Sequence, residues 1–331
     1  MDTIDSFQQI PHLPRHLGRS GRTALLTLSL TAAAGCVGEL DTRSSVHDLR
    51  ILAIQATPPE VHVLDAAAAG SQTFRLEVLA PDVSGGALAG AERHYRVALC
   101  PKLSSGRCGL PEQEVLVEEG VYSGDSFGVT FTLGLSSAEL LLSTLEQDPW
   151  HGFGGLPLPV TVQVWNDGGA VEHAYKEIVL QIPQLSVEGE PDNENPPPPV
   201  LTDAEGALLP ASGVTVPLPG DWKLDVDPAA REARPRYSVP TYSGGTLSID
   251  ESWTYQWFST RGTFAPETTG GLNPVTGEAL SAVTTLTTTS KDGEGDFIIW
   301  CVLRDGRGGV SWTRLNGTAD KALSEDEEAA P

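Results

Sequence analysis

The clearest fold signal in the chain is the segment of residues 160–165, Val-Thr-Val-Gln-Val-Trp, together with the turn that follows it, Asn166-Asp167-Gly168-Gly169. Apolar and polar side chains alternate along residues 160–165, so one face of this segment is buried and the other is wet. An Asp-Gly pair after such a segment is a strong hairpin signal, because glycine tolerates a positive φ. The stretch therefore predicts a half-buried strand that leads into a β-hairpin.

The same pattern recurs in the second half of the chain. Residues 302–307, Val-Leu-Arg-Asp-Gly-Arg, also follow an apolar strand and precede another strand, which indicates an internal repeat. Other segments of strand character are residues 49–54, 74–79, 95–99, 115–117, 129–133, 253–258, 283–288, 297–303 and 310–315. Their spacing predicts an all-β fold of two tandem Ig-like antiparallel β-sandwiches, each ending in the same hairpin.

One short helix is expected in the first sandwich. Ser136-Ser137-Ala138-Glu139 has the form of a capping box, in which the serine and the glutamate each satisfy an unpaired amide of the first turn. Leu140, Leu141 and Leu145 then supply an apolar stripe at helical spacing. We expect this helix to connect two strands.

Composition shifts divide the chain into six parts. Acidic residues followed by Pro196–Pro199 predict a semi-rigid spacer in polyproline II conformation, and the acidic C-terminus without aromatic residues predicts disorder. The expected parts are a signal peptide (1–35), a tether (36–47), a first sandwich (48–185), a linker (186–199), a second sandwich (200–317) and a disordered tail (318–331).

The N-terminal segment has the layout of an export signal. Arg15, Arg19 and Arg22 precede an apolar core at residues 23–34, which is too short to span a bilayer. Small residues then lead to Cys36. The segment resembles a bacterial lipoprotein signal peptide, and the resemblance implies that Cys36 becomes the first residue and carries a lipid anchor. The alternative is an ordinary secretory signal followed by a chance cysteine.

Two neighbours of Cys36 bear on this resemblance. Ala33 stands where the family usually has leucine, which is a departure from its pattern. Val37 stands where an aspartate would favour retention in the inner membrane, so the resemblance implies an outer-membrane lipoprotein. Stable anchoring is then expected, because each buried CH₂ of the acyl chains contributes about 0.8 kcal/mol.

The strands also carry a resemblance. Residues 49–54 leading into Pro58-Pro59-Glu60, and residues 257–264 joined to 304–310, are similar to Gram-negative surface lipoproteins with tandem Ig-like domains. The similarity extends over most of the chain after Cys36, but its motifs are structural. It implies a fold and a location and assigns no functional residue.

The net charge of −23 excludes some partners. Binding to a nucleic-acid backbone needs clusters of lysine and arginine, so no nucleic-acid partner is expected. The same charge disfavours docking on anionic lipid, which leaves the lipid anchor as the expected contact with a membrane.

The remaining cysteines predict one local disulfide. Cys100 and Cys108 flank a turn-rich loop, and an exported protein meets an oxidising environment, so we expect them to be bonded to each other. Loop entropy gives this bridge a value of about 2–3 kcal/mol. Cys301 lies in an apolar strand and is expected to be a small buried side chain.

Sequence motifs for catalysis are missing. The chain has no Gly-Lys-Ser/Thr phosphate loop and no His-Glu-x-x-His helix. Residues 124–128 carry the letters Gly-x-Ser-x-Gly, but a predicted strand follows them instead of the helix that a hydrolase elbow needs, so we expect no enzyme activity and no cofactor. Asp292, Glu294 and Asp296 form a weak candidate for calcium, because hard cations prefer several oxygen ligands. Ordinary turn chemistry explains the same residues without a metal.

Aromatic residues raise a second alternative. Trp253, Tyr255 and Trp257 share one face of a predicted strand, where they belong either to the core or to a platform that stacks on sugar rings. We therefore expect a non-enzymatic, lipid-anchored cell-envelope protein with a structural or adhesive role, which presents its second domain away from the membrane. Its partner would be an envelope protein or a polysaccharide. The alternative function is a carbohydrate-binding module of a surface polysaccharide system.

Overall fold

A computed structural model of the chain describes most residues from 43 to 321. The described ranges are 43–83, 92–101, 103–105, 107–139, 152–182, 187–241 and 243–321. The predicted signal peptide, Cys36 and residues 322–331 of the predicted acidic tail lie outside them. Residues 318–320 of that tail belong to the last strand, Val310–Asp320, so the second sandwich extends three residues past the predicted boundary at 317.

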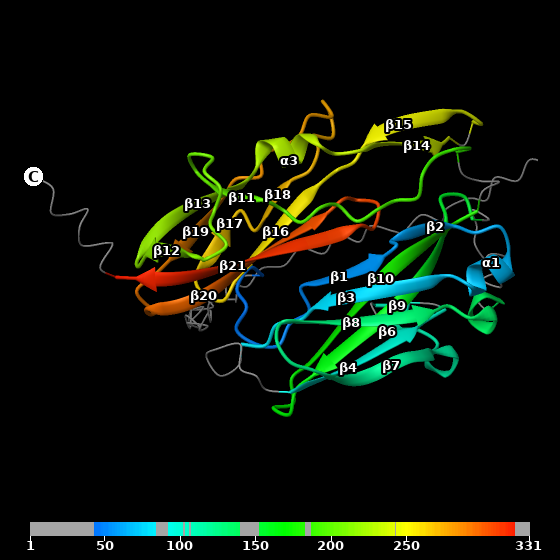
Figure 1. Cartoon of the computed structure of the whole chain (residues 1–331), viewed down its shortest axis with the longest axis horizontal. Coiled ribbons are helices and arrows are strands. Elements are labelled where there is room, and N and C mark those ends of the chain that lie inside the picture. The colour runs from blue at the N-terminus through cyan, green and yellow to red at the C-terminus, as the bar shows by residue number, and fades with distance from the viewer. Residues whose placement is uncertain are drawn as a thin grey trace, which may run out of the picture. The chain divides into compact units, whose positions relative to one another are not determined.

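The first sandwich consists of a three-stranded sheet facing a five-stranded sheet (Figure 1). The smaller sheet has the order β1 (Ala53–Thr57), β3 (Thr73–Leu79), β8 (Ser126–Thr132). The larger sheet has the order β2 (Glu60–His62), β10 (Val171–Gln181), β9 (Leu156–Trp165), β4 (Arg93–Leu99), β7 (Val115–Tyr122). Between them lies a core built from the alternating apolar residues of both sheets, which include Leu76 and Val162.

The second sandwich repeats this arrangement (Figure 1). Its smaller sheet has the order β11 (Leu201–Asp203), β13 (Gly220–Val226), β19 (Thr284–Thr288), β17 (Thr263–Ala265). Its larger sheet has the order β12 (Val214–Pro217), β21 (Val310–Asp320), β20 (Gly295–Arg304), β16 (Thr254–Ser259), β18 (Thr268–Gly270). In both sandwiches the second strand crosses to the larger sheet and pairs in parallel with the last strand, whereas the other pairs are antiparallel. The predicted all-β fold of two tandem Ig-like sandwiches is confirmed.

Several short elements accompany the two sandwiches. Residues 135–139 are helical, at the place where the sequence predicts a helix, and Leu140, Leu141 and Leu145 lie outside the described residues. Sequence analysis missed two further helices, α1 (Ala66–Gly70) and α3 (Pro228–Glu232). It also missed two small hairpins, β5 (Leu103–Ser104) with β6 (Arg107–Cys108), and β14 (Arg236–Pro240) with β15 (Thr246–Asp250).

The two repeated hairpin turns share two hydrogen bonds. Asn166 N–H donates to the Ala170 carbonyl over 3.2 Å, and Asp305 N–H donates to the Gly309 carbonyl over 3.2 Å. The side-chain oxygen of Asn166 accepts from Ala170 N–H, and that of Asp305 accepts from Gly309 N–H. Asn166 is therefore equivalent to Asp305. The repeat predicted from sequence is real but shifted by one residue, because it paired the two aspartates.

Asp41–Pro331 forms one compact unit, and within it the sandwiches share an apolar junction. The outer face of the second sandwich's larger sheet contributes Phe258, Trp300, Val302 and Val310 to this cluster. Leu52, Ala53 and Leu79 of the first sandwich cover them, together with Val46.

Charged groups surround this junction. Arg307 donates to Glu60 over 3.0 Å, lies 3.7 Å from Glu251 and stacks over the Tyr237 ring. Lys176 donates to the Gly308 carbonyl, and burial lowers the pKa of its ammonium group to about 8. These contacts join the last hairpin turn of the second sandwich to the first sandwich.

The described part of the predicted linker contacts both sandwiches. Asn195 donates to the Ala56 carbonyl over 2.8 Å, and its side-chain oxygen accepts from Val310 N–H over 3.0 Å. Asn193, which is buried, donates to Asp305 over 2.8 Å. The carbonyls of Pro197 and Pro199 accept from hydroxyls of β21. The proline-rich segment is therefore bound along its length to neighbouring structure.

Candidate docking face

The predicted aromatic platform is not a surface. Trp253, Tyr255 and Trp257 all lie in the core of the second sandwich, with side chains 4%, 2% and 0% exposed. Trp257 donates to Thr269 and Trp253 donates to Glu251, so both indole N–H groups are satisfied inside the protein. Of the two alternatives for these residues, the core position is therefore confirmed and stacking on a ligand is wrong, because the facing sheet covers them.

The predicted calcium candidate is a hydrogen-bonded turn. One oxygen of Asp292 accepts from Gly262 N–H, the other from Thr289, and Asp296 accepts from Thr318. The Arg261 guanidinium donates to the carbonyls of Asp292, Gly293 and Asp296, so a cationic side chain already occupies the loop. Glu294 is exposed, and no group of three or more potential metal ligands occurs among the described residues. The calcium prediction is not supported.

The cysteine predictions have separate outcomes. Cys100 and Cys108 form the predicted disulfide, with their Cα atoms 5.5 Å apart. Cys301 is a free and fully buried thiol, and burial raises its pKa well above the ordinary value. Cys36 lies outside the described residues, so its predicted lipid attachment stays a prediction.

The outer face of the first sandwich's larger sheet stands out as a candidate site. Strand registers across β10, β9, β4 and β7 align the outward side chains in three rows. The rows are Val171, Trp165, His94, Val121; then His173, Gln163, Arg96, Glu119; then Tyr175, Thr161, Ala98, Leu116. An apolar and aromatic row and a partly apolar row thus flank a polar row on one rigid sheet.

Exposed apolar side chains gather in the outer rows. Val171 and Tyr175 are each 47% exposed, Val121 is 50% exposed and Leu116 is 51% exposed. Trp165 is half-buried and stacks on His94, with ring centroids 5.3 Å apart. Exposed apolar groups that share one face of a sheet are typical of an interaction site, whereas single ones need no explanation.

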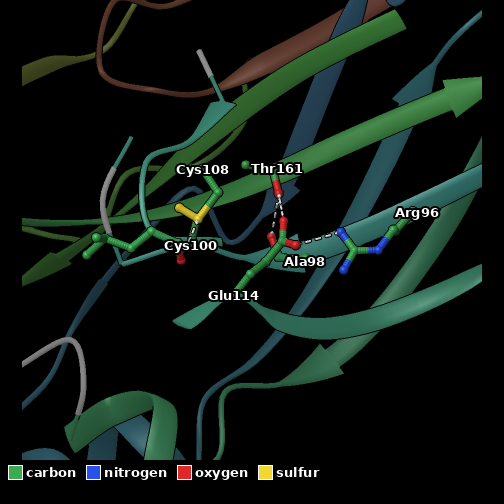
Figure 2. Close-up of a disulfide and its surroundings, with 7 residues drawn as sticks. Arg96, Ala98, Cys100, Cys108, Glu114 and Thr161 are labelled. Atoms are coloured by element: carbon green, nitrogen blue, oxygen red, sulfur yellow. Dashed lines mark hydrogen bonds and ion pairs between the residues drawn. A yellow bond between two sulfur atoms is a disulfide. The ribbon is translucent and has the colours of Figure 1, made fainter. Parts of the chain in front are cut away.

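The disulfide braces one side of this face, as Figure 2 shows. It ties the end of β4 to the β5–β6 hairpin, from which the chain runs into edge strand β7. Beside it, Arg96 donates to Glu114 over 2.7 Å, and Thr161 donates to the same carboxylate over 3.3 Å. The loop carboxylate is thereby fixed against two strands of the sheet.

A shallow groove runs next to this carboxylate. Arg96, Arg107, Glu114, Gln163 and His173 are among the residues that line it. Burial and the neighbouring charge of Arg107 lower the pKa of His173. The face carries Arg96 and Arg107 beside Glu114 and Glu119, and two further carboxylates lie at its edge, Asp167 beside His94 and Glu177 after Tyr175. Basic and acidic side chains are therefore mixed on this face.

Sequence analysis did not assign a role to this face. Trp165 belongs to the very stretch that predicts the fold, and its parity opposes the buried valines of β9. A tryptophan on the wet side of an alternating strand was the available signal. The sequence could not place His94 and Val121 beside Trp165, because their alignment depends on the register of strands that are distant in sequence.

No helix in the described part of the chain is long and apolar enough to cross a membrane.

Comparisons with known proteins do not identify a relative. No family model matches the chain, and no curated protein matches it. The tandem V-type regions of VCBP3, a v-region-containing chitin binding protein, align with 12% identity over 82% of this chain and 100% of that chain, at a TM-score of 0.26. Murine CEACAM1b aligns with 10% identity over 82% of this chain and 100% of that chain, at a TM-score of 0.19.

A third solved structure matches a smaller part of the chain. The superoxide reductase (neelaredoxin) from Ignicoccus hospitalis aligns with 15% identity over 44% of this chain and 89% of that chain, at a TM-score of 0.24. Because all three TM-scores are below 0.5, the Ig-like assignment rests on the strand order and the registers described above.

Proposed function

We propose that this protein is a non-enzymatic, lipid-anchored cell-envelope protein with an adhesive role, and that the outer face formed by β10, β9, β4 and β7 binds a second copy of the chain. The observation that carries the proposal is the open face with exposed apolar rows, on which arginines and carboxylates are mixed. The anchor is proposed from the signal-peptide resemblance at Cys36.

The chemistry of the face favours a protein partner over a polysaccharide. Sugar rings are bound on exposed, flat aromatic faces, but His94 covers one face of Trp165. The most exposed residues of the apolar rows are aliphatic, namely Val121 and Leu116. Protein interfaces combine such aliphatic groups with tryptophan, tyrosine and arginine, and this face carries all three.

The charge distribution favours a second copy as the partner. Two chains of net charge −23 repel each other over most of their surfaces. The docking face carries both arginines and glutamates, so a two-fold related pair can bring Arg96 or Arg107 of one copy to Glu119 of the other. Symmetric pairing requires such a self-complementary patch.

The anchor is tested by expressing the full chain in a Gram-negative host beside the variant Cys36→Ser. Wild type should gain the mass of the acyl chains and sediment with membranes, and the variant should do neither. If both proteins are soluble and unmodified, the lipid anchor is rejected and the protein is a secreted factor.

The docking face is tested by sedimentation velocity of the purified chain over a range of concentrations. Wild type should associate, and Val121→Asp should abolish association because it places a charge in the apolar row. The matched control is Val275→Asp, since Val275 is 90% exposed on the second sandwich. Tethered proteins reach effective concentrations of about 1 mM, so a wild-type chain that stays monomeric up to about 1 mM contradicts a second copy as the partner.

A further inference from the structure

The segment that follows the proposed anchor is built into the second sandwich. Val46 N–H donates to the Ser259 carbonyl over 2.8 Å, and Ser259 N–H donates to the Ser44 carbonyl over 2.8 Å. The hydroxyl of Ser45 donates to the Gly262 carbonyl, and that of Ser44 accepts from Phe264 N–H. Residues 44–46 therefore form a short parallel bridge at the end of β16, more than 200 positions away in sequence.

Burial holds the same segment in place. Val46 is 1% exposed and belongs to the apolar junction with Phe258 and Trp300. Arg50 donates to the Ser45 carbonyl over 3.1 Å and stacks over the Phe258 ring. The predicted tether ends at position 47, but its residues 44–46 are fixed to the second sandwich by backbone bonds and by packing.

This attachment limits where an anchored molecule can sit. Eight peptide units separate Cys36 from Ser44, and a fully extended chain of that length spans at most about 29 Å. We propose that the end of the second sandwich formed by the turn Ser259–Gly262 and the loop 289–295 is the membrane-facing end. The inference rests on the proposed lipid anchor at Cys36, and it reverses the expectation that the second domain is held away from the membrane.

Charge at this end is compatible with a lipid surface. Four basic residues lie in or beside it, namely Arg43, Arg50, Arg261 and Lys291. Five acidic residues lie there as well, namely Asp48, Glu267, Asp292, Glu294 and Asp296. This nearly even mixture contrasts with the whole chain, which has 44 acidic and 21 basic residues. Because bacterial lipid surfaces are anionic, a nearly neutral end approaches them at lower electrostatic cost than the rest of the chain.

The opposite end of the second sandwich is defined by the start of β16. Thr254 pairs with Gly270, and Gly271 N–H donates to the Trp253 carbonyl, so the loop 271–280 lies at that end. Five residue steps along β16 separate Thr254 from Ser259, or about 16 Å. Val275 in this loop and Glu294 in the loop near Ser45 are both exposed, so they mark the two ends without disturbing the core.

The experiment measures energy transfer from the protein to the bilayer. A clickable amino acid at Glu294, Val275 or Leu64 carries the donor dye, and Leu64 marks the first sandwich beyond β1 and β2. The acylated full chain from the expressing host is reconstituted in phosphatidylcholine vesicles that contain a trace of rhodamine-labelled phosphatidylethanolamine. Transfer should be highest from Glu294. Equal or higher transfer from Val275 or Leu64 overturns the inference.

A variant pair tests the cause of this order. Val46→Pro removes the N–H that bonds to Ser259, so residues 44–46 should detach from the second sandwich. The transfer efficiencies from Glu294, Val275 and Leu64 should then become similar. His47→Ala changes an exposed neighbour and should keep the wild-type order. Near-ultraviolet circular dichroism verifies that both variants are folded. An unchanged order in a folded Val46→Pro protein contradicts the role of residues 44–46.

Intact mass separates failure of this inference from failure of the proposed anchor. If Cys36 carries no acyl group, the anchor is rejected, and the orientation is then measured after coupling Cys36 to a maleimide lipid. This coupling is selective, because Cys301 is buried and Cys100 is bonded to Cys108. Transfer highest from Glu294 in the coupled protein supports the orientation without the anchor, and any other order contradicts it.

Discussion

The two larger sheets have the same strand order, but the outer face of one is buried and the outer face of the other is open. In each sheet an aromatic pair joins the same two neighbouring strands: His94 lies opposite Trp165 in the first sandwich, and Phe258 lies opposite Trp300 in the second. Trp300 is fully buried beneath Leu52 and Leu79, whereas Trp165 is only half-buried. The outer face of the same sheet can therefore serve as an internal junction in one sandwich and as an open face in the other.

Strand order therefore does not determine which face of a sheet is covered by other parts of the chain. The first sandwich and Val46 cover Trp300, so its burial depends on segments of the chain that lie outside its own sheet. Nothing within the described residues gives Trp165 an equivalent cover, and this is the basis for proposing a second copy as its partner. Four predictions test the contrast, in order of decreasing effect.

Truncating the two tryptophans should give opposite results. Trp300→Ala leaves a large cavity at the junction and should lower the free energy of unfolding by about 3–5 kcal/mol. Trp165→Ala on the open face should cost less than about 1 kcal/mol, because much of the side chain already contacts water. Urea unfolding of both variants measures the difference. Equal losses would contradict the assignment of one face as covered and the other as open.

Removing the disulfide should weaken only the sandwich with the open face. The variant with Cys100→Ser and Cys108→Ser loses a cross-link worth about 2–3 kcal/mol by the loop-entropy model. Hydrogen exchange should rise in β4 and β7, while β20 and β21 of the second sandwich keep their protection. A uniform rise across both sandwiches would show that the disulfide does not act locally.

Asn195→Ala should loosen the covered face. The side chain bonds the Ala56 carbonyl and Val310 N–H, which belong to different sandwiches. Losing both bonds should cost about 1–2 kcal/mol, because the released backbone groups are partly buried. Thermal unfolding measures this loss, and Asn316→Ala, at an exposed position of β21, is the control. If the Asn195→Ala protein is as stable as the control, the linker does not stabilise the junction.

Lys176 should make the junction sensitive to alkaline pH. Burial lowers the pKa of its ammonium group from 10.5 to about 8 in the folded protein. Between these values the unfolded chain binds more protons, so stability should rise with pH by up to about 1.4 kcal/mol per unit. Lys176→Met removes this contribution, so the stability of wild type relative to the variant should increase from pH 8 to pH 10. A constant difference would contradict the lowered pKa.

The strands could be predicted because their pattern is local in the sequence. The faces that are covered could not be predicted, because their cover comes from residues far away in the sequence. Alternation identified segments such as 74–79 and 310–315, because a half-buried strand imposes it directly on the sequence. The same pattern placed Trp253, Tyr255 and Trp257 on one face, but parity alone could not say that the facing sheet covers that face. Hairpin β14–β15 was missed although its strands alternate, with Tyr237 and Val239 in one and Leu247 and Ile249 in the other.

The candidate site was harder to predict than the fold. The disulfide between Cys100 and Cys108 was predictable from a short loop, because it needs only local proximity. The docking face combines β10, β9, β4 and β7, and its rows exist only after their registers are set. The linker and residues 44–46 were expected to be free of contacts, since proline and polar composition do not reveal a partner more than 100 residues away.

The bonds between residues 44–46 and the second sandwich also impose an order on folding. A ribosome releases Ser44 long before Ser259 exists, so this segment stays unpaired while more than 200 further residues are synthesised. Leu52 and Leu79, which cover Trp300 in the finished protein, remain exposed for the same interval. These apolar residues of the first sandwich are thus covered only after the second sandwich has been synthesised. A chain truncated before β20 would expose this apolar surface, to which chaperones bind.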